Sequence, residues 1–317
     1  MQLNRADLEE LLQLATQAAL AAGEYITQFD RTQLEVESKH VGSSLSAQVV
    51  TQVDLDSQAV ILSVLASSIT QYNLGVLSEE NADEAQAAHH ERITSEYFWC
   101  IDPLDGTLPF IENTSGYAVS IALVSQSGKP VLGVVFNPPS GGLYQAINDG
   151  NNSKVIKNGQ PWLTQVSDTL LEQEGKVPAA SSAVFTLFID RSFHQDPRYN
   201  PLLEAIAEQL TLVGIHELEI INTSGAVMNA IGVLESAPAA YIKLPKPQKG
   251  GGSLWDFSAT AAIFEALTQQ GLPVVVSNIH GAPLDLNRQD SYYMNHEGIF
   301  YSAYLIRMPL IDRFTAI

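Results

Sequence analysis

The chain has 317 residues, 45% of them hydrophobic, and its 35 acidic against 16 basic residues give a formal net charge of −19. This charge repels nucleic acid and anionic membrane surfaces, so we expect neither as a partner. The length favours two domains or one large layered unit over a single hydrophobic core. The only cysteine, Cys100, excludes an intramolecular disulfide and a thiolate metal cluster and suits a reducing compartment, so a cytoplasmic protein is expected.

Two amphipathic helices are predicted near the N-terminus. Residues 1–26 begin with acids and then repeat apolar side chains at helical spacing, which is typical of neither a signal peptide nor a membrane span. After a Gly/Ser-rich loop at 39–48, Thr51 or Asp54 can begin a second helix. Its apolar face is expected to contain Val60, Ile61, Val64 and Leu65.

Short apolar runs predict strands over 73–80 and 96–102, and each run ends in acidic residues. Carboxylates are thereby delivered at the C-terminal ends of two strands. From residue 116 to 162, short apolar runs alternate with the turns SGK, NPPSGG, NDG and KNG, which indicates a meander of antiparallel strands.

The second half alternates strands and helices, which favours an α/β layer. Strands are predicted over 184–189, 212–221, 239–243 and 273–277, and helices over 201–210, 223–234 and 255–268. We place a domain boundary in the polar segment 165–180. This gives an N-terminal α+β domain over 1–165 and a C-terminal α/β domain over 166–317 that completes the active site.

The stretch DPLDGT (102–107) places two like charges, Asp102 and Asp105, close together. An ordinary turn explains this spacing, and so does a cation between the two carboxylates. Asp256 follows a Gly-rich loop at the start of a helix, where it can cap the helix, ligate a metal, or do both.

Together with Glu79 and the Leu104 carbonyl, these aspartates offer the oxygen ligands that Mg²⁺ prefers. The Gly106 and Thr107 N–H groups, at the start of a predicted short helix, offer a seat for an anion. Cations beside an anion seat indicate phosphate, and metal-assisted phosphoester hydrolysis is the matching chemistry.

Four short motifs run along the chain in a fixed order: VTQVD (50–54), SEE (78–80), DPLDGT (102–107) and WDFSAT (255–260). In this order and spacing they resemble the inositol monophosphatase superfamily, which also holds 3′(2′),5′-bisphosphate nucleotidases and, more distantly, fructose-1,6-bisphosphatases. The order of all four motifs makes the resemblance specific, whereas DPLDGT alone would not be specific. It covers most of the chain, with 165–200 the least recognisable part.

The resemblance implies a layered αβαβα sandwich, Mg²⁺-dependent phosphomonoester hydrolysis, inhibition by Li⁺ and a homodimer. Two or three Mg²⁺ ions would be held. Their ligands would be Glu79, Asp102, the Leu104 carbonyl, Asp105 and Asp256. Thr107 with Asp54 would orient and deprotonate the attacking water, helped by Glu79. Substrate contacts would come from Asp105, Gly106, Thr107, Ser224, Gly225 and Lys243.

The chain departs from the family pattern in three places. Gln48 stands where an Asp commonly precedes the VVT segment, and Leu108-Pro109-Phe110 replaces the Lys-Glu-Phe that commonly follows DPLDGT in nucleotidases. In AAYIK (239–243), Lys243 replaces the Glu with which inositol phosphatases grip substrate hydroxyls. A lysine there can pair with a second anionic group of the substrate, or it can be a solvated lysine beside Lys246 and Lys249.

The leading hypothesis is therefore a Mg²⁺-dependent phosphatase of a small phosphorylated metabolite, with an inositol or other polyol phosphate placed first. The alternative is a 3′(2′),5′-bisphosphate nucleotidase acting on 3′-phosphoadenosine 5′-phosphate. A second alternative is a catalytically weak relative that binds a phosphorylated metabolite.

Overall fold

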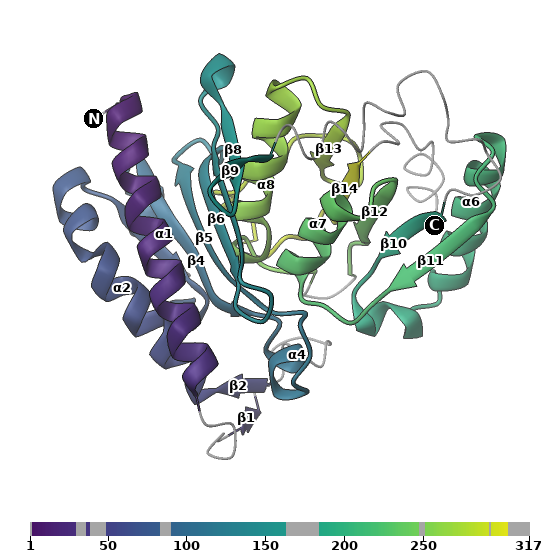
Figure 1. Ribbon diagram of the computed structural model, residues 1–317, viewed down its shortest axis with the longest axis horizontal. Helices are drawn as coiled ribbons and strands as arrows, with labels where there is room; N and C mark the ends of the chain where they lie inside the picture. The colour runs from purple at the N-terminus through teal and green to yellow at the C-terminus, as the bar shows by residue number, and fades with distance from the viewer. Residues whose placement is uncertain are drawn as a thin grey trace.

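The computed structural model describes residues 2–29, 36–38, 49–82, 90–162, 184–246, 251–291 and 293–303. Their helices and sheets alternate in five layers (Figure 1). The sequence-based expectations for Gln48 and for a boundary within 165–180 lie outside the described residues.

The helices are α1 (Arg5–Gln28), α2 (Gln52–Tyr72), α3 (Glu91–Thr94), α4 (Thr107–Ile111), α6 (Tyr199–Leu212), α7 (Ala226–Glu235) and α8 (Trp255–Gln269), with 3-10 turns η3 (Glu79–Asn81), η5 (Gly150–Asn152) and η6 (Arg191–Gln195). The first strands are β1 (Val36–Ser38), β2 (Val49–Thr51), β3 (Gly75–Ser78), β4 (Tyr97–Asp105), β5 (Ala118–Ser125), β6 (Pro130–Asn137), β7 (Gly142–Ile147), β8 (Lys154–Lys157) and β9 (Gln160–Pro161). The later strands are β10 (Val184–Phe188), β11 (Glu217–Ile221), β12 (Ala239–Lys243), β13 (Val274–Ser277) and β14 (Ile299–Ala303).

Two sheets form the framework. The larger has seven strands in the order β3-β4-β5-β6-β7-β8-β9, and the smaller has five in the order β11-β10-β12-β14-β13. Helices α1 and α2 cover the outer face of the larger sheet, α7 and α8 lie between the sheets, and α6 covers the far face of the smaller sheet (Figure 1). The layered αβαβα sandwich expected from the sequence is confirmed.

Strand β4 shows how the apolar pattern builds these layers. Successive side chains of a strand point to opposite faces, and this sheet has a helical layer on each side. Phe98 and Cys100 are buried against α7 and α8, whereas Trp99 and Ile101 are buried against α1 and α2. The continuous apolar run before Asp102 is therefore that of a central strand buried on both faces.

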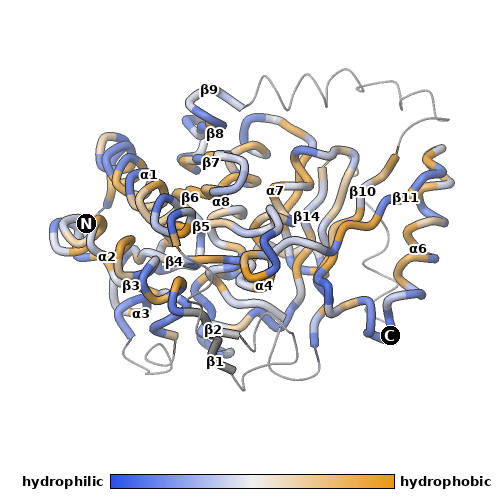
Figure 2. The backbone as a smooth tube through the Cα atoms, turned by 60° about the horizontal axis from the view of Figure 1, so that its bottom comes forward, coloured by the Kyte–Doolittle hydropathy of each residue, from blue (hydrophilic) through white to orange (hydrophobic). Residues whose placement is uncertain are grey.

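Helix α1, predicted within residues 1–26, begins at Arg5 after a side-chain cap. The Asn4 side chain accepts hydrogen bonds from the N–H groups of Ala6 and Asp7, and Asp7 accepts one from the Asn4 N–H, which forms a capping box. Figure 2 shows α1, α2 and α6 striped with hydrophilic and hydrophobic residues, as expected for helices that cover a sheet.

Helix α2 is long and apolar enough, by length and composition, to cross a membrane. A core helix passes the same test, and α2 packs on α1 and β4 with Ile61 and Leu65 buried. The predicted apolar face is confirmed at these two positions, while Val60 and Val64 are partly buried against the same core.

Two predicted strands need correction, and a third strand was missed. Strand β4 continues through Asp105 instead of ending at 102, because the chain stays paired with β5 across a bulge between Asp102 and Asp105. The strand predicted over 212–221 begins only at Glu217, because α6 extends to Leu212. Strand β14 was not predicted, although it joins β12 to β13 in the smaller sheet.

Candidate active site

The parallel pairing of β3 and β4 brings the first two acids together. Ser78 pairs with Ile101, so Glu79, which follows the end of β3, comes to lie beside Asp102 within β4. Asp102 is 2% exposed. Burial raises the pKa of Asp102 well above its ordinary value, and the negative charge of Glu79 raises it further.

The turn that follows Asp102 is held from two sides. The Leu104 N–H donates to Asp102 Oδ1 at 3.1 Å, which closes an Asx turn. The Ser57 hydroxyl of α2 donates to the Pro103 carbonyl at 2.8 Å. Ordinary turn chemistry is thus present at DPLDGT, and it fixes the position of Asp102.

Three of the predicted metal ligands converge. Asp102, Asp105 and Asp256 each place a carboxylate oxygen within 4.8 Å of the others. Burial, followed by the charge of Asp256, raises the pKa of Asp105 to about 8, and burial raises the pKa of Asp256 as well. Such a group of carboxylates is costly to ionise without a cation.

The N-terminus of α7 grips Asp105. The carboxylate of Asp105 accepts hydrogen bonds from the N–H groups of Ala226 at 3.1 Å and Val227 at 2.9 Å. A Cβ on Gly225 would lie 2.3 Å from Asp105 Oδ2, so only glycine leaves room for this approach. The Asp105 carboxylate is thus tied to the second half of the chain.

Asp54 and Thr107 meet as predicted, although they come from different elements. Asp54 lies in the first turn of α2 and is 2% exposed, and the Thr107 hydroxyl is 3.4 Å from its Oδ1. The same hydroxyl is 3.4 Å from the Leu104 carbonyl oxygen. A threonine hydroxyl has one proton, so it can donate to only one of these acceptors at a time.

Gln58 holds the segment that carries Glu79. Its Oε1 accepts from the Ser78 hydroxyl and from the Glu80 N–H, the latter at 3.3 Å, and its Nε2 donates to Asn81 at 3.0 Å. Ser57 and Gln58 were not predicted as site residues. Their signal was available, because with Asp54 they occupy one helical face at spacings of three and four.

Lys243 lies beside Asp256 and is not a solvated lysine. Its side chain is 11% exposed, and its Nζ is 3.0 Å from Asp190 Oδ2 and 4.0 Å from Asp256 Oδ2. Asp190 also accepts from the Tyr241 hydroxyl at 2.8 Å. Asp190 was missed because nothing in its local sequence marks it as a partner of a lysine on β12.

The remaining predicted substrate residues surround this cluster. Gly106 caps α4 in the left-handed region at φ 85°, and its neighbour Thr107 begins that short helix. Ser224 is half-buried just before α7. The Gly225 N–H donates to the Gly116 carbonyl at 2.7 Å. The Gly225 N–H is therefore already hydrogen-bonded within the protein, and a substrate contact by Gly225 stays a prediction.

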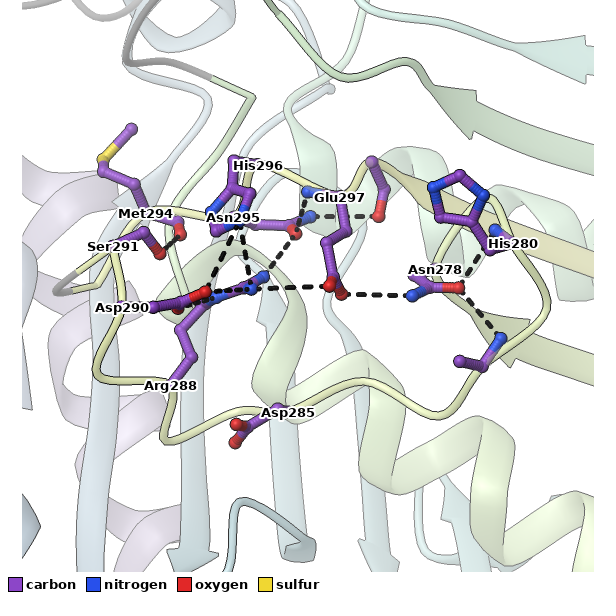
Figure 3. Close-up of polar contacts among 12 residues, drawn as sticks. Asn278, His280, Asp285, Arg288, Asp290, Ser291, Met294, Asn295, His296 and Glu297 are labelled. Atoms are coloured by element: carbon purple, nitrogen blue, oxygen red, sulfur yellow. Dashed lines mark hydrogen bonds and ion pairs between the residues drawn. The ribbon is translucent and has the colours of Figure 1, made fainter. Parts of the chain in front are cut away.

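One cavity lies apart from the carboxylates. It has about 620 Å³ and is lined by Gln126, Ser127, Asp285, Asn287, Arg288, Gln289, Asp290 and Glu297. Arg288 already pairs with Asp290 at 3.0 Å and Glu297 at 3.6 Å (Figure 3). Because the charge of Arg288 is neutralised by these two acids, the cavity has little positive charge to bind a phosphate. We therefore place the chemistry at the carboxylate cluster.

The loop 252–254, which leads into α8, supports Asp256. The Leu254 N–H donates to Tyr293 and the Asn295 N–H donates to Gly252, both backbone bonds. Between these two points, the Ser253 N–H donates to Asp256 Oδ2 at 3.0 Å. The loop thereby fixes the segment from which Asp256 enters the cluster.

The whole arrangement can be compared with known proteins. The inositol monophosphatase family matches residues 7–307. The chain belongs to this family. It is a metal-dependent phosphoric monoester hydrolase, and the resemblance carried by the four sequence motifs is confirmed.

Among similar proteins, the 3′(2′),5′-bisphosphate nucleotidase CysQ of Escherichia coli is 27% identical over 286 residues, covering 89% of this chain and 96% of that protein. The inositol-1-monophosphatase of Synechocystis is 32% identical over 142 residues, covering 44% of this chain and 45% of that protein. The inositol monophosphatase structure from Anabaena has 20% identity and a TM-score of 0.60, covering 98% and 97% of the two chains.

The residues present fit a hard divalent cation. Asp102, Asp105 and Asp256 supply only oxygen donors, and their combined charge exceeds that of the neighbouring Lys243 ammonium. Mg²⁺ prefers such donors. The acidic cluster is therefore compatible with the metal dependence of the family.

Proposed function

We propose that the chain is a Mg²⁺-dependent phosphatase of a small phosphorylated metabolite. One observation carries the proposal: Asp102, Asp105 and Asp256, from β4 and α8, converge within 4.8 Å at a place where like charges need a cation. The Thr107 hydroxyl contacts both Asp54 and the Leu104 carbonyl on one side of this cluster.

In this proposal, two or three Mg²⁺ ions are held by Glu79, Asp102, the Leu104 carbonyl, Asp105 and Asp256. When bound, the cations supply Lewis-acid stabilisation of the phosphoryl oxygens and lower the pKa of water. Thr107 and Asp54 orient the attacking water and take its proton, with Glu79 as the second acceptor. The Gly106 and Thr107 N–H groups and Ser224 position the phosphate and the rest of the substrate.

We place a 3′(2′),5′-bisphosphate nucleotide first among substrates. Lys243 supplies a cation where the inositol phosphatase pattern has a glutamate. Lys246 lies near it, because burial and then the charge of Lys243 lower the pKa of Lys246. Cations gathered in a strongly acidic protein favour a substrate with a second anionic group. The Escherichia coli relative, which aligns over 96% of its own length, is also a bisphosphate nucleotidase.

An inositol or other polyol phosphate is the second candidate. The ammonium of Lys243 already pairs with Asp190 at 3.0 Å, which leaves less charge for a second phosphate. The segment after DPLDGT reads Leu108-Pro109-Phe110, which favoured this substrate in the sequence analysis. We further propose a cytoplasmic homodimer inhibited by Li⁺ and divided into an N-terminal domain (1–165) and a C-terminal domain (166–317).

The test is phosphate release from 3′-phosphoadenosine 5′-phosphate, inositol 1-phosphate and fructose 1,6-bisphosphate, with Mg²⁺, with EDTA, and with Mg²⁺ plus Li⁺. We expect Mg²⁺-dependent turnover with the bisphosphate nucleotide preferred. Asp102→Asn should lower turnover at least about a thousandfold, since it removes a ligand charge. The matched control Asp149→Asn, a surface carboxylate beside Arg5, should not change it. Tight binding of these compounds without turnover would instead identify a binding protein.

A further inference from the structure

The ammonium of Lys243 occupies the border of the carboxylate cluster. Its Nζ is 4.0 Å from Asp256 Oδ2, and Asp256 shares the cluster with Asp102 and Asp105. A unit positive charge that close to a ligand carboxylate is felt strongly in a buried environment. The same carboxylate is thus approached by a protein cation and by the metal proposed above.

Lys243 is anchored independently of any metal. Asp190 holds its Nζ at 3.0 Å, and the ring of Phe257 lies 5.4 Å from the same atom. Asp190 is itself fixed by the Tyr241 hydroxyl. The ammonium therefore has partners outside the cluster that keep it in place when a cation arrives.

The charge of Lys243 persists despite burial. Burial alone would lower the pKa of Lys243, but the surrounding carboxylate charges and the hydrogen bond to Asp190 together raise it. In the opposite direction, burial would raise the pKa of Asp190, but the charge of Lys243 and the hydrogen bonds from Tyr241 and Lys243 together lower it. The two groups form an ion pair with its positive end toward Asp256.

We propose that Lys243, oriented by Asp190, acts as a built-in counter-charge that weakens the binding of Mg²⁺ at Asp256. This inference rests on the proposed metal site and adds a determinant of metal affinity to it. The ammonium stabilises the carboxylates of the metal-free cluster, and its positive charge repels the divalent cation that binds there.

The test measures Mg²⁺ binding itself, by isothermal titration calorimetry and by the Mg²⁺-dependent rise in Tm, with Mg²⁺ as the only ligand. Lys243→Gln removes the charge and keeps an N–H donor for Asp190, and it should lower the Kd for Mg²⁺ at least about tenfold. Lys243→Met is the second neutral variant. Lys246→Met, which makes the same change in net charge, should alter Kd less than about twofold.

Two further variants test the partners. Asp190→Asn leaves the ammonium without its counter-ion and should weaken Mg²⁺ binding, the opposite direction from Lys243→Gln. In an Asp256→Asn background, the gain from Lys243→Gln should largely disappear, because the shared carboxylate is gone.

The outcomes separate the two ideas. If the wild-type protein binds no Mg²⁺ at millimolar concentrations, the proposed metal site is wrong. If the wild type binds Mg²⁺ but Lys243→Gln and Lys243→Met, both folded by circular dichroism, bind it no more tightly than Lys246→Met, the metal site stands and the role of Lys243 is refuted.

Discussion

The buried carboxylates Asp102, Asp105 and Asp256 should make the metal-free protein lose stability as the pH rises from about 6 to about 8. Burial, followed by the charge of Asp256, raises the pKa of Asp105 from 3.8 to about 8, and Asp102 and Asp256 shift in the same direction. The folded protein therefore keeps a proton that the unfolded chain has released. The stability that the retained proton of Asp105 contributes is fully present below its ordinary pKa of 3.8. It is lost progressively as the pH rises to the folded pKa of about 8.

The size of the effect follows from Asp105 alone. While the unfolded group is ionised and the folded one is protonated, stability falls by about 1.4 kcal/mol per pH unit. Because Asp105 begins to ionise near pH 8, the loss between about pH 6 and pH 8 is roughly 2 kcal/mol. For a chain of this size, Tm should fall on the order of 4 °C.

The assay is thermal and urea unfolding followed by circular dichroism in EDTA across this pH range. Asp105→Asn is the control, since it cannot ionise, and its stability should fall about 2 kcal/mol less over the same interval. With saturating Mg²⁺ the wild-type loss should disappear, because the cation binds the ionised carboxylates. Equal pH slopes for chelated wild type and Asp105→Asn would refute the reasoning.

Three substitutions test how the site is positioned. Gly225→Ala places a Cβ 2.3 Å from Asp105 Oδ2, and we expect a loss of about 1–3 kcal/mol in urea unfolding together with weaker Mg²⁺ binding; an unchanged Mg²⁺ titration would argue against the contact. Gln58→Ala should cost about 1–3 kcal/mol and raise the Mg²⁺ concentration needed for half-maximal activity, whereas Ser63→Ala on the exposed side of the same helix should do neither. Thr107→Val should lower kcat about 100-fold or more while Thr107→Ser retains most of it, and equal rates for the two would exclude a role for the hydroxyl.

The local pattern of the sequence was sufficient for much of the fold. Helical spacing located α1 and α2, and turn residues between short apolar runs located the meander from β5 to β9. The order of the acidic motifs pointed to Asp102, Asp105 and Asp256, which the structure brings together. The helices and strands are readable because each depends on residues close together in the sequence, whereas the acidic motifs were recognised by their order over residues 50–260.

Contacts between distant segments were decided only by the tertiary structure. Strand β14 is short, and its place between β12 and β13 follows from pairing with strands far away in the chain. The same holds for Lys243, whose sequence context is equally compatible with a solvated lysine. Its ion pair with Asp190 and its distance to Asp256 depend on the packing of β10, β12 and α8. A sequence thus determines which charged groups a protein contains, but the fold decides which of them share a buried space, where the interaction between charges is strongest.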